Sequence, residues 1–474
     1  MPPIADDIFF APITELNARL KKREFSCQEL TRAFLDRLEA QGPRFNALAL
    51  SLRESAIKKA KDVDTELTRE RYRGLLQGVP FGAKDLLAVS DHPTTWGARP
   101  YAAQVFPEDA AVIKRLDKQG AVLTGKLAMI ELAGGPSYRF ARASLTGACL
   151  NPWNKSHWAG GSSSGSGAAV AAGLVPYAIG SETSGSILTP SAYCGITGLR
   201  PTYGLVPRTG AMALSWTLDK LGPMARTVED CAWILQAIAG SDKNDPGSAG
   251  KSFYYAPQFV RPFSDIKVAF APVDFEGWAE PAAQPDFRKA VETIRALGVQ
   301  LIEAKIPEFP YGAVLSTILN GECGSIFETL ITSGKVDQLD DAKQIAGLKA
   351  AREVSAADYL KAMRIRRLIQ QAFAEFFYQY DIILAPARIN TATRVSDPLD
   401  RPLQRTLPKD RGFSGLIPAG NLAGLPALSI PCGFANGLPI GLQLVARPFN
   451  ENLILALGKA FQARTDFHQR RPPV

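Results

Sequence analysis

The stretch that decides the fold covers residues 160–204 and reads GGSSSGSGAAVAAGLVPYAIGSETSGSILTPSAYCGITGLRPTYG. Glycine and serine are dense at its start, and the small-residue run 168–172 follows. This order is typical of a tight loop that leads into a helix whose backbone approaches a neighbouring segment closely. A flexible linker has a similar composition, but it does not continue into an apolar helix and a strand. The stretch therefore predicts a packed loop, helix and strand.

Around this stretch, short apolar runs alternate with helical patterns, which predicts an α/β fold. Residues 120–124 and 177–180 read as strands, and residues 110–119 and 225–239 read as helices. A capping box at Ser26 opens an earlier helix that stops at Gly42.

Two strands are also expected in a hairpin near the end of the chain. Residues 428–432 and 440–445 flank Asn436-Gly437, a hairpin signal, although the loop looks longer than the ideal two residues. A further buried strand is expected at residues 266–271, after a polar connection over residues 241–265. We expect the late strands to join the same sheet as the early ones.

The composition limits the class of protein. A chain of 474 residues with 46% hydrophobic content can bury a large core. The net charge of +8 is dispersed, with short basic runs at residues 21–23 and 470–471, which favours a solvated surface over nucleic-acid binding. The six cysteines are widely separated and are expected to be reduced and buried. No signal peptide or membrane span is recognisable, so a cytoplasmic protein without a membrane partner is expected.

Several motifs occur together in a fixed order. GVPFGAKD at residues 78–85, the strand at 120–126 and residues 425–449 accompany the segment 160–204. With these motifs, almost the whole chain resembles the amidase signature family. The resemblance implies an α/β amidase signature fold, in which helices flank both faces of a large central mixed β-sheet. It also implies one domain over residues 1–474, with catalytic motifs in 60–240, a variable substrate-shaping region in 241–420, and C-terminal strands and a helix in 421–474.

The resemblance also implies the catalytic residues. Lys84 falls at the family's catalytic lysine, Ser162 at its bridging serine and Ser186 at its nucleophile, with the family's spacing between the two serines. The peptide bond before Ser162 is expected to be cis. Physical chemistry favours the same assignment, because a serine needs a base and none of the three histidines comes with a recognisable aspartate partner. A lysine can act as base when burial keeps it neutral, and an apolar run precedes Lys84.

We therefore expect neutral Lys84 to withdraw the proton of Ser186 through Ser162, and the resulting acyl-enzyme to be hydrolysed by water. The family supplies oxyanion donors from the backbone just before the nucleophile. Here the N–H groups belong to Ser186 itself and to the residues that precede it: Thr183, Ser184 and Gly185. Two further side chains, Ser163 and Glu182, are expected to support the site. We expect no metal and no cofactor.

Three residues near Ser186 depart from the family pattern. Glu182 replaces aspartate, which keeps the charge and lengthens the side chain. Ser184 replaces glycine, and a Cβ is tolerable there only if φ is negative. Leu188 replaces arginine, which removes a cation and favours a neutral or apolar acyl group.

Hydrolysis of a small neutral or apolar amide is therefore the function that we expect, with esters or anilides as side substrates. One alternative is the glutamine amidase subunit of a glutamyl-tRNA(Gln) amidotransferase-like complex, and another is a catalytically inactive binding protein. The expected partner is the small-molecule amide, without nucleic acid, and a homodimer is left open. Candidate pocket-wall residues, each equally suited to the core, are Trp216, Tyr311, Ile326 and Phe327.

Two motifs resemble other sites. GAVLTGKL at residues 120–127 approaches a P-loop, but Leu127 stands where serine or threonine must hold magnesium. GSSSG at residues 161–165 fits a G-x-S-x-G elbow with His468 downstream, but that reading leaves Lys84 and Ser186 without a role. Cys194 has no basic neighbour and is expected to serve packing.

Overall fold

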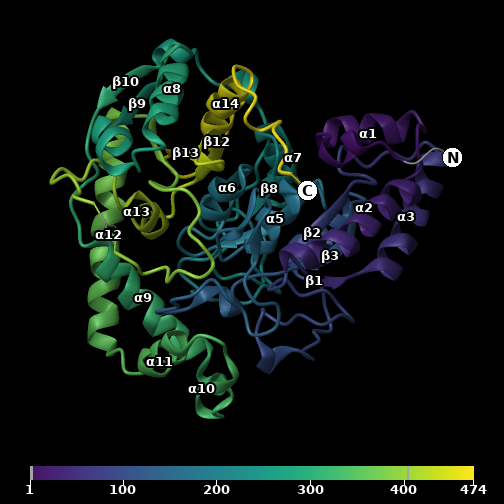
Figure 1. Cartoon of the computed structure of the whole chain (residues 1–474), viewed down its shortest axis with the longest axis horizontal. Coiled ribbons are helices and arrows are strands. Elements are labelled where there is room, and N and C mark those ends of the chain that lie inside the picture. Colours follow the sequence, from purple (N-terminus) through teal and green to yellow (C-terminus); the bar gives the residue numbers. More distant parts are fainter. Residues whose placement is uncertain (1–3, 403–404, 474) are drawn as a thin grey trace.

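One mixed β-sheet crosses the centre of the molecule (Figure 1). The computed structural model describes residues 4–402 and 405–473. In this part of the chain, eleven strands form the sheet: β1 (Leu48–Ser51), β2 (Pro80–Lys84), β3 (Val122–Leu127), β6 (Tyr177–Glu182), β7 (Thr197–Arg200), β8 (Lys220–Ala225), β9 (Lys267–Phe270), β10 (Gln300–Glu303), β11 (Ile382–Pro386), β12 (Ala427–Ala435) and β13 (Leu438–Ala446). A separate ribbon consists of β4 (Leu150–Asn151) and β5 (Asn154–Trp158).

The spatial order of the strands is β1-β3-β2-β6-β8-β7-β12-β13-β11-β9-β10. β2 is parallel to both β3 and β6, and β9 is parallel to both β10 and β11, whereas the other neighbours are antiparallel. The predicted α/β fold with a large mixed sheet is therefore confirmed.

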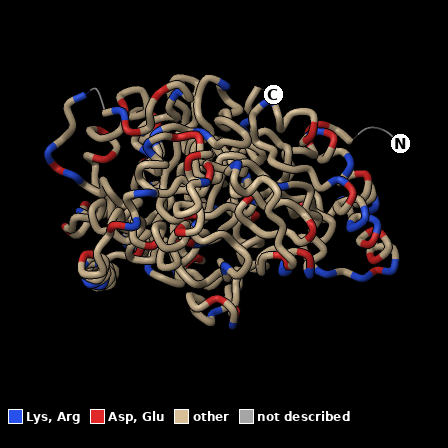
Figure 2. The backbone as a smooth tube through the Cα atoms, turned by 90° about the horizontal axis from the view of Figure 1, so that it is seen from below, with Lys and Arg blue, Asp and Glu red and all other residues tan. Residues whose placement is uncertain are grey.

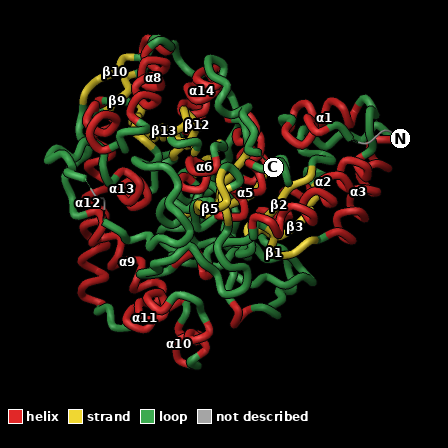
Figure 3. Tube along the Cα trace, in the orientation of Figure 1, coloured by secondary structure: helices red, strands yellow, loops and turns green. Residues whose placement is uncertain are grey.

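Helices surround the sheet (Figure 3). They are α1 (Ile13–Lys21), α2 (Cys27–Gln41), α3 (Arg53–Thr68), α4 (Ala111–Lys118), α5 (Ser164–Ala171), α6 (Leu188–Cys194), α7 (Val228–Ile238), α8 (Gln284–Arg295), α9 (Tyr311–Ile326), α10 (Glu328–Thr332), α11 (Ala342–Ala351), α12 (Ala356–Gln379), α13 (Leu416–Ala423) and α14 (Glu451–Gln462).

The sheet is buried on both faces, as the continuous apolar run of β11 illustrates. Ile382 and Leu384 enter one hydrophobic core, which also contains residues of α7 and α14. Ile383 and Ala385 enter another core, which contains residues of α9, α12 and α13. Because successive side chains of a strand point to opposite faces, this alternation places helices on both sides of the sheet.

The predicted elements occur close to their expected positions. α2 begins after Ser26, whose side chain accepts from the backbone of Glu29 in the expected capping box. The late hairpin also forms, but the expectation of a longer loop is wrong: Asn436 and Gly437 alone join β12 to β13. Both residues have positive φ, at 51° and 76°, which is the backbone geometry of a two-residue hairpin turn.

The glycine-rich loop leads into a helix that approaches its neighbours closely, as predicted. A Cβ added at Gly165, in α5, would lie 2.5 Å from the backbone of Ala47 and of Ala128. The Gly165 N–H donates to the Ala128 carbonyl at 2.8 Å. Glycine is therefore required where α5 crosses the ends of β3 and its neighbours.

The six cysteines are free and buried, as the sequence predicts.

Lysine, arginine and acidic residues alternate along the outer segments of the chain (Figure 2). Among the residues described, no helix combines the length and the apolar character needed to cross a membrane.

Candidate active site

Lys84 is the last residue of β2, and Ser181 and Glu182 end the parallel neighbour β6. The carboxyl ends of parallel strands lie at the same edge of a sheet, where loops assemble sites in α/β folds. The Lys84 amine is fully buried and lies 2.8 Å from Ser162 Oγ and 2.8 Å from Ser181 Oγ. The sequence motifs did not single out Ser181, although its place at the end of the strand after Gly180 was a usable signal.

Burial lowers the pKa of Lys84 to about 7, because desolvation disfavours the ammonium. The carboxylates of Asp219 and Glu182 oppose this effect. The amine is therefore neutral in a large fraction of molecules near pH 7, as a lysine base requires.

The loop before α5 carries Ser162 and is hydrogen-bonded to the segment that carries Ser186. The Gly161-Ser162 peptide bond is cis, as expected. The N–H of the next residue, Ser163, donates to the Ser186 carbonyl at 3.2 Å, so the loops that carry the two serines lie side by side. The Ser163 hydroxyl donates to the Ser181 carbonyl at 3.1 Å and accepts the Ser181 N–H at 3.2 Å. Ser163 thus fixes the loop to β6, and its hydroxyl is not bonded to a histidine.

Glu182 is a completely buried carboxylate that organises the loop around Ser186. Its Oε2 accepts the N–H groups of Ile187 at 2.9 Å and Leu188 at 3.0 Å. Its Oε1 accepts from Arg200 Nη1 and from Asn421 Nδ2, both at 2.9 Å.

Burial alone would raise the pKa of Glu182, but Arg200, Lys220 and the Asn421 amide hold it at about 2. Glu182 is therefore ionised throughout the working pH range. Its partners come from β7, β8 and α13, and no sequence motif points to them. Only the three-dimensional pairing of these distant elements brings them to Glu182.

The residues before Ser186 present unpaired backbone donors. Within the described residues, the N–H groups of Ser184, Gly185 and Ser186 have no hydrogen-bond acceptor. Ser184 has a negative φ, which meets the condition for a Cβ at this position, and Gly185 has a φ of 91°. The Thr183 side chain donates to Asp219 Oδ1 at 2.6 Å, which fixes the start of this loop. Three adjacent N–H groups are thus free to bind an oxyanion.

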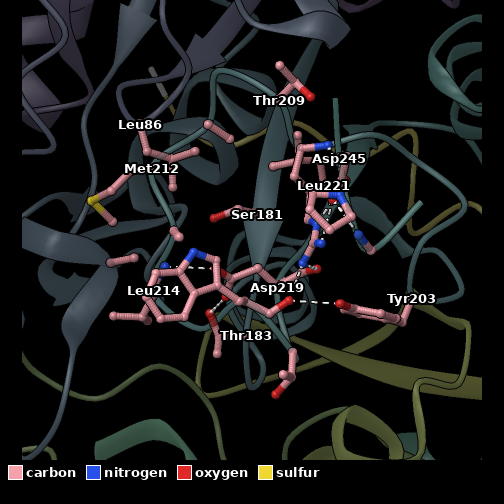
Figure 4. A pocket seen from close by; sticks show the side chains of 18 of the residues that line it. Leu86, Ser181, Thr183, Tyr203, Thr209, Met212, Leu214, Asp219, Leu221 and Asp245 are labelled. Atoms are coloured by element: carbon pink, nitrogen blue, oxygen red, sulfur yellow. Dashed lines mark hydrogen bonds and ion pairs between the residues drawn. The ribbon is translucent and has the colours of Figure 1, made fainter. Parts of the chain in front are cut away.

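A cavity of about 500 Å³, here called the Trp216 cavity, reaches this loop through Ser181 and Thr183 (Figure 4). Leu86, Met212, Leu214 and Leu221 form apolar parts of its wall, and the half-exposed Trp216 also lines it. Asp219 and Asp245 are buried carboxylates in its wall, and Asp219 is held by the N–H groups of Leu214 and Ser215.

A second cavity, of about 630 Å³, reaches the same loop through Gly161 and Ser184 and also contains Arg388. We call it the Arg388 cavity. Neither cavity is lined by Leu188, whose side chain is fully buried in the hydrophobic core beneath α13. Leu188 therefore does not set the polarity of either cavity wall.

Other residues singled out in the sequence lie elsewhere. Of the four candidate wall residues, Trp216 lines the Trp216 cavity. Tyr311 and Phe327 are buried in two different hydrophobic cores, and Ile326 packs against the core that contains Phe327. In the P-loop-like segment, Lys126 is buried in β3 and forms an ion pair with Asp85 at 2.9 Å. Cys194 is fully buried, and its thiol donates to the Ala159 carbonyl.

The Amidase family model matches residues 29–455 of the chain. The chain therefore belongs to the amidase family, the amidase signature enzymes, and it is a hydrolase of amide bonds. Enzymes of this family use a serine nucleophile and a Ser-Ser-Lys triad.

Three relatives illustrate the range of the family. The chain is 35% identical to a glutamyl-tRNA(Gln) amidotransferase subunit of Gloeothece citriformis, over 98% of this chain and 99% of that protein. It is 30% identical to the peptide amidase of Stenotrophomonas maltophilia, with a TM-score of 0.83 and 98% of each chain covered. A vestigial protein complex related to the origins of an s-triazine catabolic enzyme contains a chain that is 29% identical, with a TM-score of 0.86, covering 96% of this chain and 98% of that one.

Proposed function

We propose that Ser186 is the nucleophile of this amidase, with Lys84 as the base and Ser162 as the relay between them. The observation that carries the proposal is the fully buried Lys84 amine 2.8 Å from Ser162 Oγ, with a pKa of about 7. Lys84 takes a proton from Ser162 as Ser162 takes one from Ser186. Ser186 Oγ then attacks the amide carbonyl, and the free N–H groups of Ser184, Gly185 and Ser186 are the donors that stabilise the oxyanion.

The proton returns along the same relay to the leaving nitrogen as the carbon–nitrogen bond breaks. Water then attacks the acyl-enzyme, losing its proton to the relay, and releases the acid together with the restored Ser186 hydroxyl. Glu182 supports this chemistry as a positioning residue, because it holds the N–H groups of Ile187 and Leu188 and so fixes the turn that presents Ser186.

For the substrate, we propose the carboxamide of glutamine or a glutamine-like amide, hydrolysed as the ammonia-releasing step of an amidotransferase-type complex. The relatives named as subunits of glutamyl-tRNA(Gln) amidotransferase support this proposal, since eight of them match at 33–36% identity over 97–98% of this chain. The partner is then a protein complex as well as the small amide.

The second candidate is a free-standing amidase for small neutral or apolar amides. The apolar wall of the Trp216 cavity and the likeness to peptide amidase favour it. A free-standing enzyme hydrolyses its amide at full rate alone, whereas an amidotransferase subunit hydrolyses glutamine weakly until its partner chains are added.

The experiment compares ammonia release from glutamine, acetamide, hexanamide and a peptide amide by the purified chain. Ser186→Ala, Ser162→Ala and Lys84→Ala serve as matched variants. Covalent labelling by a fluorophosphonate should require Ser186 and should disappear in Ser186→Ala. Full hydrolysis by Lys84→Ala, or unchanged labelling of Ser186→Ala, would contradict the proposed roles. Absence of any labelling of the wild type would favour the catalytically inactive binding protein instead.

A further inference from the structure

Arg388 follows β11 and lines the Arg388 cavity, and none of the ion pairs among the described residues includes it. Its Nε is buried and has no hydrogen-bond partner in that part of the chain. The ring of Tyr193 lies 6.0 Å from the guanidinium carbon. A buried guanidinium nitrogen without an acceptor is costly, because it has lost its water without gaining a hydrogen bond.

Two other buried polar atoms in the same wall also have no partner. They are the indole N–H of Trp158 and the hydroxyl of Thr393. All three groups can donate a hydrogen bond, and the indole and the guanidinium cannot accept one. Unsatisfied donors on three residues that line one cavity are accounted for by a ligand with acceptor oxygens.

The charge of the cavity wall also favours a ligand with acceptor oxygens. Arg388 and Arg401 are its cations, and Asp397 is the carboxylate that lines it among the described residues. Asp397 is already paired with Arg401 at 3.1 Å, so the described residues of the wall offer Arg388 no free carboxylate. A guanidinium binds a carboxylate through two parallel hydrogen bonds and is the preferred cation for that purpose.

We propose that Arg388 binds a carboxylate of the substrate, so that the preferred amides carry an anionic group at the far end of the molecule from the scissile bond. The Arg388 cavity reaches the catalytic loop through Gly161 and Ser184, whereas the Trp216 cavity reaches it through Ser181 and Thr183. This inference rests on the proposed amidase site and names its substrate class. It replaces the expectation, drawn from Leu188, of a neutral or apolar acyl group.

The test compares glutaramate, whose chain ends in a carboxylate, with its methyl ester, which presents the same carboxamide without the charge. The wild type should hydrolyse the carboxamide of glutaramate with the higher kcat/KM. Arg388→Met should lower the ratio of the two kcat/KM values by about tenfold or more, as expected for a charge-assisted hydrogen bond. The loss should lie mainly in KM, and Arg388→Lys should restore part of it.

Arg401→Met is the matched control, since it removes a positive charge from the same cavity wall, but one already paired with Asp397. It should change the ratio by less than about threefold. An equal fall of kcat/KM for both substrates in Arg388→Met would mean that Arg388 has a structural role, and it would overturn the inference. A wild type with the higher kcat/KM for the methyl ester would also overturn it.

Binding provides a readout that does not depend on turnover. Glutarate, the product of glutaramate hydrolysis, should bind Ser186→Ala in calorimetry and should bind the double variant with Arg388→Met at least about tenfold more weakly. Equal binding by both proteins would overturn the inference even if no amide is hydrolysed. If instead only the methyl ester is hydrolysed, and its hydrolysis requires Ser186, the proposed amidase site is supported. The proposed preference for anionic substrates is then contradicted.

Discussion

The pKa of the buried lysine is the property on which the proposed chemistry depends most directly. An ordinary lysine has a pKa near 10.5, so only about one amine in 10³ is neutral at pH 7.4. With a pKa of about 7, Lys84 is neutral in roughly 70% of molecules at that pH. The difference corresponds to about 5 kcal/mol against the ammonium, and it raises the supply of the base by nearly three orders of magnitude.

The assay is the pH dependence of kcat/KM between pH 5.5 and 9. Because the neutral amine is the active form, kcat/KM should rise with pH through about 7 and level off above pH 8. It should fall about tenfold for each pH unit on the acid side. Lys84→Met keeps a similar buried volume but cannot take a proton, so it should lower kcat/KM by about 10³-fold. It should also abolish the acid limb of the profile, which is the fall of kcat/KM below pH 7.

Lys126→Met is the matched control, because Lys126 is also a fully buried lysine, near the end of the neighbouring strand β3. Its removal leaves Asp85 without its ion-pair partner and should lower the melting temperature, yet the folded enzyme should keep the acid limb near pH 7. A wild-type profile that is flat from pH 6 to 9, or a limb that survives in Lys84→Met, would refute the argument.

Three further variants test the surroundings of the site. Glu182→Gln leaves the buried Arg200 without its counter-charge and should lower the free energy of unfolding by about 3–5 kcal/mol in urea titrations; an unchanged midpoint would contradict this. Ser184→Gly should lower the free energy of unfolding by no more than about 1 kcal/mol in the same titrations, because Ser184 already has a negative φ. Burial raises the folded-state pKa of Asp230 to about 7, so its contribution to stability is present at low pH and is lost as pH rises through 7. Asp230→Asn, which can still accept from Ile13 N, should therefore raise the melting temperature more at pH 8 than at pH 5.5, and an equal gain at both would oppose the assignment.

Much of the fold and the core of the site follow from local sequence. Alternating apolar runs predicted the α/β class, and the capping box at Ser26 predicted α2 close to its observed start. Lys84, Ser162 and Ser186 stand in motifs that resemble those of the amidase signature family, so the motifs are enough to propose them as the catalytic residues.

The partners of these residues follow from topology, which local patterns do not encode. Asn421 and Arg200 meet Glu182 only because β7 and α13 are brought to the end of β6. Arg388 lies in the region 241–420, where the periodicity is irregular, and nothing in its neighbours along the chain distinguishes it from a surface arginine. Its significance comes from its missing partner and its cavity.

The order of the strands also has a consequence for synthesis on the ribosome. The first six strands in spatial order, β1 to β7, are complete only when β8 ends at Ala225, and the outer edge of β7 is covered by β12, which begins at Ala427. From Ala225 to Ala427, about 200 residues of translation, the growing chain therefore carries a strand edge with unsatisfied amide and carbonyl groups. The nascent amidase is accordingly exposed to aggregation until its last hairpin emerges, and its yield should depend on chaperone supply during that interval.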